Sequence, residues 1–336
     1  MSFSCVACTR SDLKPVRRYR LDTNYGRDVF GDAWLHMCNV CGLVQMVPRP
    51  EPQSVADYYV RDYRKGGMYG SDVADAKKFP KDNLFYYNRG QSIAELVSPY
   101  IRRENPQILD IGAGFGHILH AFGERYPSSR RLAIESSDVC VQHLTSLGVQ
   151  VFTQSVEEVL PRMEQRFDII VLSHVFEHLL DPRGILDLIH TSLVPHGVLY
   201  IEVPNIPAES LLRYPDHVWA PRFDEPHITF FSALTLHQML TSASFEPVFC
   251  DTAGAEYTNI SWLRFHLPHW RWFLQRLIPP PLFHWLRRQK FTQAMRVPER
   301  VESFYNYGGF RIWIRSISRK KNETLKRKGQ SKDFTF

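Results

Sequence analysis

Short apolar runs alternate with segments of helical periodicity between about residue 84 and residue 250. An uninterrupted run such as 167–172 is typical of a strand buried on both faces of a parallel sheet. Strands are predicted at 108–111, 131–135, 149–152, 167–172 and 197–203, with a closing antiparallel pair at 245–250 and 309–315. Helices are predicted at 84–103, 117–126 and 138–147. This alternation predicts an α/β fold with a doubly wound, Rossmann-like sheet of seven strands.

The first predicted strand ends in a glycine-rich turn, Asp110-Ile-Gly-Ala-Gly-Phe-Gly116. Glycine occupies every second position after Asp110, and His117 stands where a dinucleotide fingerprint, G-x-G-x-x-G, needs a small residue. A strand, a glycine turn and a helix let a ligand approach the backbone at the carboxyl edge of a sheet. The turn resembles the (D/E)-x-G-x-G-x-G loop of class I S-adenosylmethionine (SAM) methyltransferases. The alternative is a tight turn that binds no ligand.

An acid at the end of the second strand completes this predicted pocket. Glu135 can accept hydrogen bonds from both ribose hydroxyls, as acids at this position do in nucleotide-binding folds. Its alternative role, capping the next helix, can be filled by Ser136, Ser137 or Asp138. The predicted SAM-binding residues are Asp110, Gly112, Ala113, Gly114, Gly116, Glu135, Ser136, Ser155, Val156, Ser173 and His174.

Four of the six cysteines form two C-x2-C pairs near the N-terminus, Cys5 with Cys8 and Cys38 with Cys41. Each pair can wrap one side of a tetrahedral ion, so the four thiolates predict a zinc ribbon over residues 1–50. A site closed by four thiolates leaves no open coordination position, and the Zn²⁺ is therefore expected to be structural. The alternative is a redox pair or disulfides, which a cytosolic location disfavours. Cys140 and Cys250 are expected in the core.

The remaining segments divide the chain further. Residues 51–84 are predicted to be a linker or lid, whose Tyr59, Tyr63 and Tyr69 either face a substrate or pack the linker onto the sheet. The SAM-binding core is predicted at 85–256. An aromatic and basic helical insertion at 257–305, a last core strand at 306–318 and a disordered basic tail at 319–336 complete the expected organisation.

Charge is unevenly distributed over the 336 residues, whose net charge is +6. From Tyr257 onward there are 17 Lys and Arg against 4 Asp and Glu, a balance of +13, which leaves −7 for residues 1–256. Interleaved Trp, Arg and Phe at 261–290 suit contact with an anionic membrane surface, a cap over the acceptor or a dimer face. We found no spanning segment or signal pattern and expect a cytoplasmic protein, peripheral on the inner membrane face if that contact forms. The oligomeric state is not predicted.

Three further stretches carry a closer resemblance. Residues 168–182, Val203-Pro-Asn205 and Glu225-Pro-His-Ile-Thr-Phe-Phe-Ser232 resemble bacterial SAM methyltransferases that act on sugars and surface polysaccharides. Within that group, the sugar C-methyltransferases also carry an N-terminal zinc ribbon of four cysteines. Their zinc segment continues after the last cysteine much as Cys41-Gly-Leu-Val-Gln45 does here.

This resemblance implies the catalytic residues. The family's base is a histidine in a Glu-His-Leu-Ser-Tyr-Phe-Ser stretch, which His227 matches, and a second family histidine matches His178. The family's glutamate beside the base falls on Pro226, which leaves Glu225 as an off-register substitute. SAM supplies its own activated methyl group, so the protein must align the reactants and remove one proton. A hydroxyl acceptor needs only one base, so the missing glutamate favours transfer to oxygen over carbon.

The sequence therefore predicts a SAM-dependent methyltransferase whose acceptor is a sugar, as a nucleotide sugar or on a glycan. The first alternative is a zinc-containing rRNA or tRNA methyltransferase, whose basic tail would track phosphates. The acidic balance of residues 1–256 argues against nucleic acid, as does the absence of an Asn/Asp-Pro-Pro-aromatic cluster for a planar amine. A binding module without turnover is the second alternative, and the intact glycine loop and Glu135 argue against it.

Overall fold

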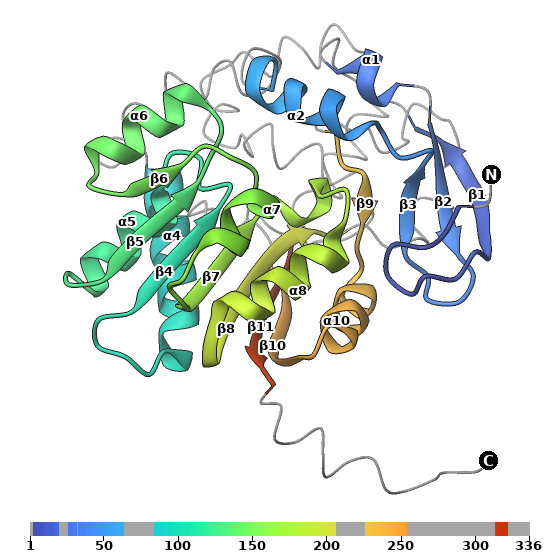
Figure 1. The fold of residues 1–336 in the computed structure, drawn as a ribbon. Coiled ribbons are helices and arrows are strands. Elements are labelled where there is room, and N and C mark those ends of the chain that lie inside the picture. Colours follow the sequence, from blue (N-terminus) through green and yellow to red (C-terminus); the bar gives the residue numbers. More distant parts are fainter. Residues whose placement is uncertain are drawn as a thin grey trace, which may run out of the picture.

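The structure is a computed structural model that describes residues 3–19, 26–31, 33–63, 84–205, 226–253 and 313–321. Its main feature is a seven-stranded sheet in the order β10-β11-β8-β7-β4-β5-β6 (Figure 1). The strands are β4 (Gln107–Ile111), β5 (Arg130–Ile134), β6 (Gln150–Phe152), β7 (Phe167–Ser173), β8 (Leu193–Pro204), β10 (Phe245–Ala253) and β11 (Trp313–Lys320). The five strands from β8 to β6 are parallel, and β11 runs antiparallel between β8 and β10.

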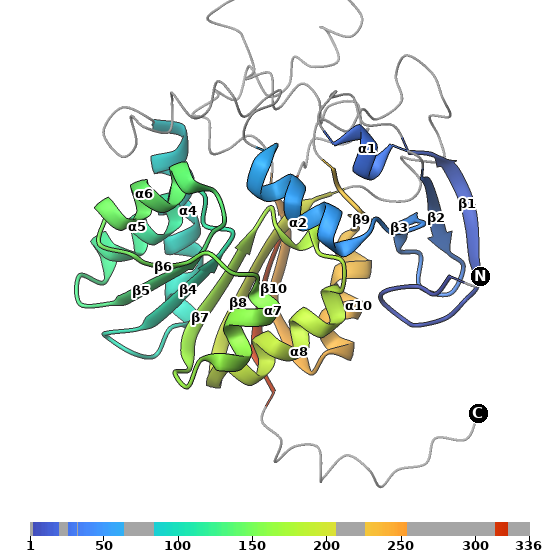
Figure 2. The same ribbon diagram turned by 45° about the horizontal axis from the view of Figure 1, so that its top comes forward.

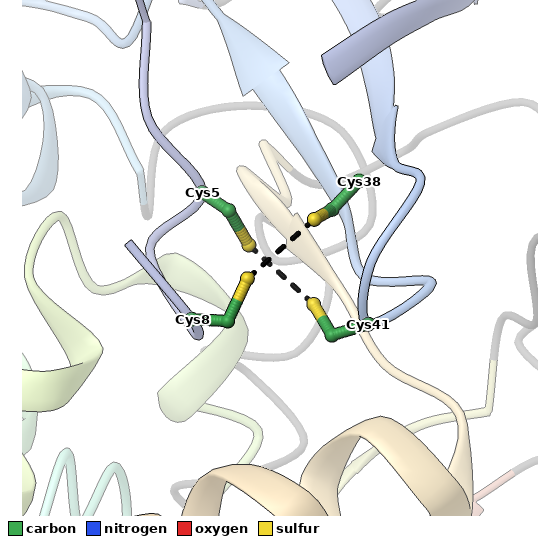
Figure 3. A group of neighbouring side chains, drawn as sticks. All are labelled: Cys5, Cys8, Cys38 and Cys41. Atoms are coloured by element: carbon green, nitrogen blue, oxygen red, sulfur yellow. Dashed lines mark hydrogen bonds between the residues drawn. The ribbon is translucent and has the colours of Figure 1, made fainter. Parts of the chain in front are cut away.

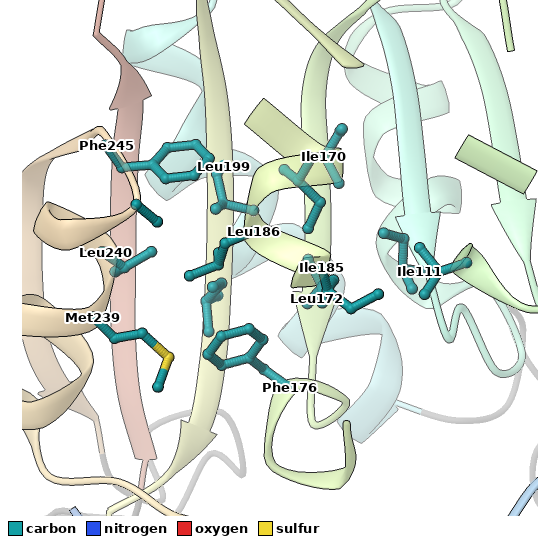
Figure 4. Close-up of a cluster of buried hydrophobic side chains, with 14 of the residues drawn as sticks. Ile111, Ile170, Leu172, Phe176, Ile185, Leu186, Leu199, Met239, Leu240 and Phe245 are labelled. Atoms are coloured by element: carbon teal, nitrogen blue, oxygen red, sulfur yellow. The ribbon is translucent and has the colours of Figure 1, made fainter. Parts of the chain in front are cut away.

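Helices cover both faces of this sheet (Figures 1 and 2). One face carries α4 (Leu84–Val97), α5 (His117–Arg125) and α6 (Asp138–Ser146), and the other carries α7 (Val156–Val159), α8 (Pro182–Ser192) and α10 (Ala233–Ser242). Each face of the sheet has its own hydrophobic core, and alternate residues of β7 contribute to each. Ile169 and Val171 pack on the α4 side, and Ile170 and Leu172 pack on the α8 side. Figure 4 shows this second core, with Ile170 and Leu172 among its labelled side chains. Burial of both faces explains the continuous apolar runs in the sequence.

The strand order creates a switch point at β4, which pairs with β5 on one side and with β7 on the other. The connections leaving β4 and β7 therefore diverge at the carboxyl edge, where a ligand-binding crevice is expected in open α/β sheets. The glycine turn follows β4, and η3 (Phe176–His178), a short 3₁₀ helix, follows β7. The fold thus brings the predicted SAM loop and the predicted histidine loop to the same edge.

A second sheet of four strands holds the N-terminal residues, in the order β1-β2-β3-β9. β1 (Leu13–Arg18), β2 (Trp34–Cys38) and β3 (Val44–Val47) come from the N-terminal segment, and β9 (Thr229–Phe230) comes from the core segment that carries His227. The short helix α1 (Arg27–Phe30) and the longer α2 (Pro52–Arg61) pack against this sheet. The N-terminal module and the core are therefore joined by main-chain pairing.

Most of the predicted core elements are confirmed, with four corrections. The predicted helix 84–103 ends at Val97 and is followed by η1 (Ser98–Tyr100), because Pro99 cannot continue the helical hydrogen bonds. The last strand begins at Trp313 within the described residues and continues through Lys320. Cys250 is exposed on the edge strand β10, whereas Cys140 is buried as expected.

The fourth correction concerns the basic tail, which was predicted to begin at residue 319. Arg319 and Lys320 belong to β11, where Arg319 pairs with Val198 and lies 5.5 Å from the ring centre of Tyr100. The Lys320 ammonium donates to the carbonyl of Leu193 at 3.0 Å. Long cationic side chains can pack their stems on a sheet and keep the charged end at its rim, so charge alone does not mark disorder.

Several predictions fall outside the described residues: Tyr69, Glu225, the insertion at 257–305 and the tail from residue 322. Among the residues that the structure does describe, no helix has the length and apolar character needed to cross a membrane.

Candidate active site and metal centre

The glycine turn is built from left-handed backbone. Gly112, Gly114 and Gly116 have φ values of 70°, 54° and 75°, which side-chain-bearing residues rarely adopt. A Cβ atom on Gly112 would lie 2.4 Å from Cγ2 of Val175, in the loop after β7. The absence of a side chain at residue 112 therefore lets the histidine loop pack directly on the predicted SAM loop.

Two carboxyl groups border this turn. Glu135 follows β5, and its two oxygens accept hydrogen bonds from the backbone N–H groups of Gly114 and Ser137, both at 2.9 Å. Asp110 is 2% exposed, and burial, together with the nearby charge of Glu135, raises its pKa well above the ordinary value. Its Oδ2 makes no hydrogen bond within the described residues.

These groups fit the donor atoms of SAM. A carboxylate has about four lone-pair sites, so Glu135 can hold the turn and still accept hydrogen bonds from ribose hydroxyls. Asp110 offers a buried acceptor that lacks a partner within the described structure, and SAM has further donors in its amino group. The glycine backbone leaves room for the close approach that such a ligand needs.

The other predicted SAM-binding residues also lie near this edge. Ala113 is buried within the turn, and Ser136 follows Glu135 at the start of the connection to α6. Ser155 is the N-cap of α7 and is followed by the buried Val156. These assignments remain predictions.

Ser173 and His174 belong to a buried polar network at the end of β7. Glu202 of β8 is fully buried and pairs with Arg89 of α4, which also donates to the Ser173 hydroxyl at 2.6 Å. The hydroxyls of Ser173 and Tyr200 donate to Glu202 at 3.2 and 2.9 Å. Buried carboxylates need such partners, because an uncompensated charge in the interior is costly.

His174 connects this network to the histidine loop. Its Nε2 lies 3.4 Å from Oε1 of Glu202, and its Nδ1 lies 3.5 Å from Oε1 of Glu177. Burial acts to lower the pKa of His174, but the two carboxylates outweigh it and raise that pKa, which favours the imidazolium form. Its backbone is left-handed, with φ of 56°, which turns the chain back toward β8. His174 is thus held by protein carboxylates.

Glu177 is the centre of a second cluster, with His178 and His227. It is 1% exposed, and its Oε1 lies 3.9 Å from Nε2 of His178 and 3.9 Å from Nε2 of His227. Burial acts to raise the pKa of Glu177, but the histidines around it, His174 first, lower it overall, so the carboxylate is ionised. Neither of its oxygens has a hydrogen bond within the described residues. One buried carboxylate therefore faces the two predicted catalytic histidines.

The orientation of His178 is fixed by its surroundings. Its Nδ1 lies 3.3 Å from the carbonyl oxygen of Pro226, so Nδ1 is the donor and Nε2 has its lone pair toward Glu177 and His227. Burial lowers the pKa of His178 to about 4. The ring also packs edge-on against Tyr59 of α2, with ring centres 5.9 Å apart. A neutral imidazole in a fixed orientation is suited to accept a proton.

The three groups of this second cluster are also close enough to be considered as metal ligands, with one ligand atom each within 4.8 Å of the others. Two observations disfavour this role. The charges of Glu177 and Glu202 are already compensated by His174 and Arg89, so a divalent cation would add uncompensated charge. The 3.9 Å separations exceed the roughly 3.3 Å expected between ligands about 2.0 Å from a tetrahedral ion.

The sequence analysis assigned no role to Arg89 or Glu202 at this site, and it left Tyr59 either facing a substrate or packing the linker onto the sheet. Glu177 was recognised only as a polar residue in the same loop as His174 and His178. Arg89 lies mid-helix and meets Glu202 only through packing of α4 on the sheet. The predicted residue Glu225 lies outside the described residues, so its role remains a prediction.

The four N-terminal cysteines converge on one point (Figure 3). The Sγ atoms of Cys5 and Cys41 are 3.6 Å apart, as are those of Cys8 and Cys38. Sulfur ligands about 2.3 Å from a tetrahedral zinc ion would be about 3.8 Å apart, so the separations match within a few tenths of an ångström. Cys5 and Cys38 are buried and the other two are half-buried. The cluster fits a structural Zn²⁺.

Comparison with known proteins finds one family that is similar to the core segment. Residues 85–248 match the model of a family described as a methyltransferase domain. This segment is therefore similar to methyltransferase domains, and curated proteins similar to this chain are named as methyltransferases. It contains the glycine turn, Glu135, Glu177 and both candidate bases, whereas the four cysteines lie outside it.

Two curated relatives are similar to part of this chain. The ubiquinone biosynthesis O-methyltransferase of Idiomarina loihiensis is 26% identical over 42% of this chain and 62% of its own length. That of Azotobacter vinelandii is 27% identical over 32% of this chain and 49% of its own length. The similarity thus spans about half to three-fifths of each relative.

Solved structures with a similar chain path include the plantazolicin methyltransferase BpumL in complex with a monoazolic desmethylPZN analog and SAH. It is 14% identical with a TM-score of 0.46, covering 80% of this chain and 94% of that one. The [4+2]-cyclase SpnF is 16% identical with a TM-score of 0.45, covering 68% and 81%. A likeness of this size carries no conclusion about the reaction.

Proposed function

We propose that this protein transfers the methyl group of SAM to a hydroxyl group, with His227 as the base and His178 as the second candidate for that role. The observation that carries the proposal is the position of the Glu177, His178 and His227 cluster, beside the glycine turn of a methyltransferase domain. SAM supplies the sulfonium methyl group. The protein needs to bind it, align the acceptor, exclude water and take one proton.

Burial supports the base assignment. His227 and His178 are 5% and 8% exposed, so a bound acceptor would meet them with little competing water. The neutral form of His178 is stable at neutral pH, and Glu177 can stabilise an imidazolium that forms on proton transfer. His174 contacts both Glu177 and Glu202, and Glu202 pairs with Arg89. This network fixes the position of Glu177 and balances its charge.

We propose a sugar hydroxyl as the acceptor, on a nucleotide sugar or a glycan. This rests on the resemblance of 168–182, Val203-Pro-Asn205 and 225–232 to sugar-directed methyltransferases. The curated relatives, whose names give O-methylation, support oxygen as the accepting atom. Carbon methylation is the second candidate. The sugar C-methyltransferases have a glutamate beside the base, where this chain has Pro226, and Glu177 brings a carboxylate to 3.9 Å from His227 instead.

We also propose that the four cysteines hold a structural zinc ion, because they form a closed set of thiolates with no position for a substrate. Metal analysis of the purified protein tests this directly. About one zinc per chain, lost when Cys38 is changed to Ser, is expected, and a metal-free protein with an intact fold would contradict it.

The function is tested by incubating the protein with methyl-labelled SAM and three acceptor sets: nucleotide sugars, phenolic polyprenyl compounds and ribosomal RNA. We expect labelled product only from the sugars, with release of S-adenosylhomocysteine (SAH) and a methyl ether signal in the carbon NMR spectrum. A new carbon–carbon bond would select the second candidate. Labelling of RNA or of the phenols would overturn the sugar assignment.

A further inference from the structure

Gln45 lies between the cysteine cluster and the strand that carries His227. It is 1% exposed and belongs to β3, next to the last cysteine knuckle. Its Oε1 accepts a hydrogen bond from the backbone N–H of Val6 at 2.9 Å, and its Nε2 donates to the carbonyl of Ser4 at 3.0 Å. The two bonds fix the residues on either side of Cys5. One amide side chain thus holds the first knuckle on β3.

The backbone of Gln45 continues this connection on the other side. β3 pairs with β9, where Gln45 is opposite Thr229 and Val44 is opposite Phe230. The N–H of Met46 donates to the carbonyl of Ile228 at 3.0 Å. Ile228 is the neighbour of His227 in sequence, so the position of β3 determines the backbone position of the candidate base.

The far side of this strand is attached to the core. The N–H of Ile228 donates to the carbonyl of Glu177 at 3.1 Å. Arg49, just after β3, adds a parallel link by donating to the carbonyl of Leu179 at 2.8 Å and to the Thr229 hydroxyl at 3.4 Å. The strand beside His227 therefore lies between the N-terminal sheet and the Glu177 loop, and both must be in place to define its position.

We propose that Gln45 is a positioning residue that couples the first cysteine knuckle, Cys5 to Cys8, to the strand carrying His227. The catalytic consequence rests on the function proposed above, whereas the structural coupling does not. A glutamine suits the position because Val6 needs an acceptor and Ser4 needs a donor. Glutamate would place a carboxylate against the Ser4 carbonyl, and methionine would leave both backbone groups without their partner.

The test uses the full-length, zinc-loaded protein and its Gln45→Met variant, which keeps the length of the side chain and removes both hydrogen bonds. Gln150→Met is the matched control, because Gln150 is exposed on β6, the edge strand of the seven-stranded sheet, whereas β9 belongs to the four-stranded sheet. Three quantities are measured: zinc content, SAH affinity by calorimetry, and amide hydrogen exchange of peptides covering 226–231 and 107–111. None of these requires the acceptor to be known.

We expect Gln45→Met to raise the exchange rate of peptide 226–231 about tenfold or more. Peptide 107–111 and the SAH affinity should stay within about twofold of wild type, and Gln150→Met should change neither peptide. Unchanged exchange at 226–231 in a folded Gln45→Met variant would overturn the coupling. Equal acceleration in both peptides would also overturn it, since that result indicates general destabilisation.

Chelation of zinc from the wild-type protein is the second measurement, and it remains informative if Gln45→Met does not fold. Selective acceleration of exchange at 226–231 is expected, and no acceleration there would contradict the coupling. With an accepted sugar, Gln45→Met should lower kcat about tenfold while KM for SAM is unchanged. If no acceptor is found but the exchange result holds, the function proposed above fails and the coupling stands.

Discussion

The carboxylate of Glu177 lies 3.9 Å from Nε2 of His227, although the two residues belong to different elements, η3 and the segment before β9. Glu177 therefore supplies the carboxylate that the sequence lacks beside His227, at residue 226. It approaches the base from the loop after β7, and His174 holds it from the opposite side.

Replacement of Glu177 by Gln tests this relationship. The substitution keeps the shape and removes the charge that would stabilise an imidazolium, so kcat should fall about tenfold or more. SAH affinity should stay within about twofold, because the predicted ribose contact is Glu135 and not Glu177. Glu95→Gln, on the exposed side of α4, is the matched control and should leave kcat unchanged. Wild-type turnover by Glu177→Gln would remove the residue from the mechanism.

His227→Ala should bind SAH normally and lose turnover, because it removes the first candidate for the base. The expected loss in kcat is about a hundredfold or more, the usual contribution of a general base. His178→Ala should show the smaller loss of a supporting group. If His178→Ala instead shows the larger loss, the two roles are exchanged; near wild-type rates in both variants would refute a histidine base.

Glu135→Gln should weaken SAH binding, since hydrogen bonds to a charged acceptor contribute about 1.5–3 kcal/mol each. The expected dissociation constant is about tenfold or more above that of wild type, measured by calorimetry. Glu95→Gln, on the exposed side of α4 and outside the predicted SAM-binding residues, serves again as the control and should leave SAH affinity unchanged. An unchanged affinity in Glu135→Gln would place the ribose elsewhere.

The stability of the protein should depend on pH through His178. Burial lowers its pKa from the ordinary 6.5 to about 4 in the folded state. Between these values the unfolded chain binds more protons than the folded chain, so the free energy of unfolding should fall as the pH drops from 6.5 toward 4. This one group can account for up to about 3 kcal/mol of that loss. Denaturant unfolding of wild type and His178→Asn at pH 7 and pH 4.5 measures it; equal losses in both would contradict the assignment.

The sequence predicted the features that depend on neighbouring residues. The glycine turn and the acid after β5 were found because a strand, its turn and its terminal residue are contiguous, as at Asp110 and Glu135. The cysteine pairs were found because each knuckle is local. The strand ranges followed from burial on both faces, which is visible as an apolar run.

The missed features depend on pairing between distant segments. No local pattern shows that β9 pairs with β3, or that Arg89 meets Glu202 beneath the histidine loop. The cations at 319 and 320 looked like a solvated tail because their packing on Tyr100 and the Leu193 carbonyl is tertiary. Cys250 was assigned to the core because a lone cysteine is usually buried, and no local pattern shows that its strand, β10, lies at the edge of the sheet.

Calorimetric titration of SAM and SAH into the purified, zinc-loaded protein tests the central claim most directly. The account predicts one binding site per chain for both ligands, with affinity reduced about tenfold or more by Glu135→Gln. If neither ligand produces a binding signal at millimolar concentration, the glycine turn does not bind the methyl donor, and the proposed reaction is contradicted.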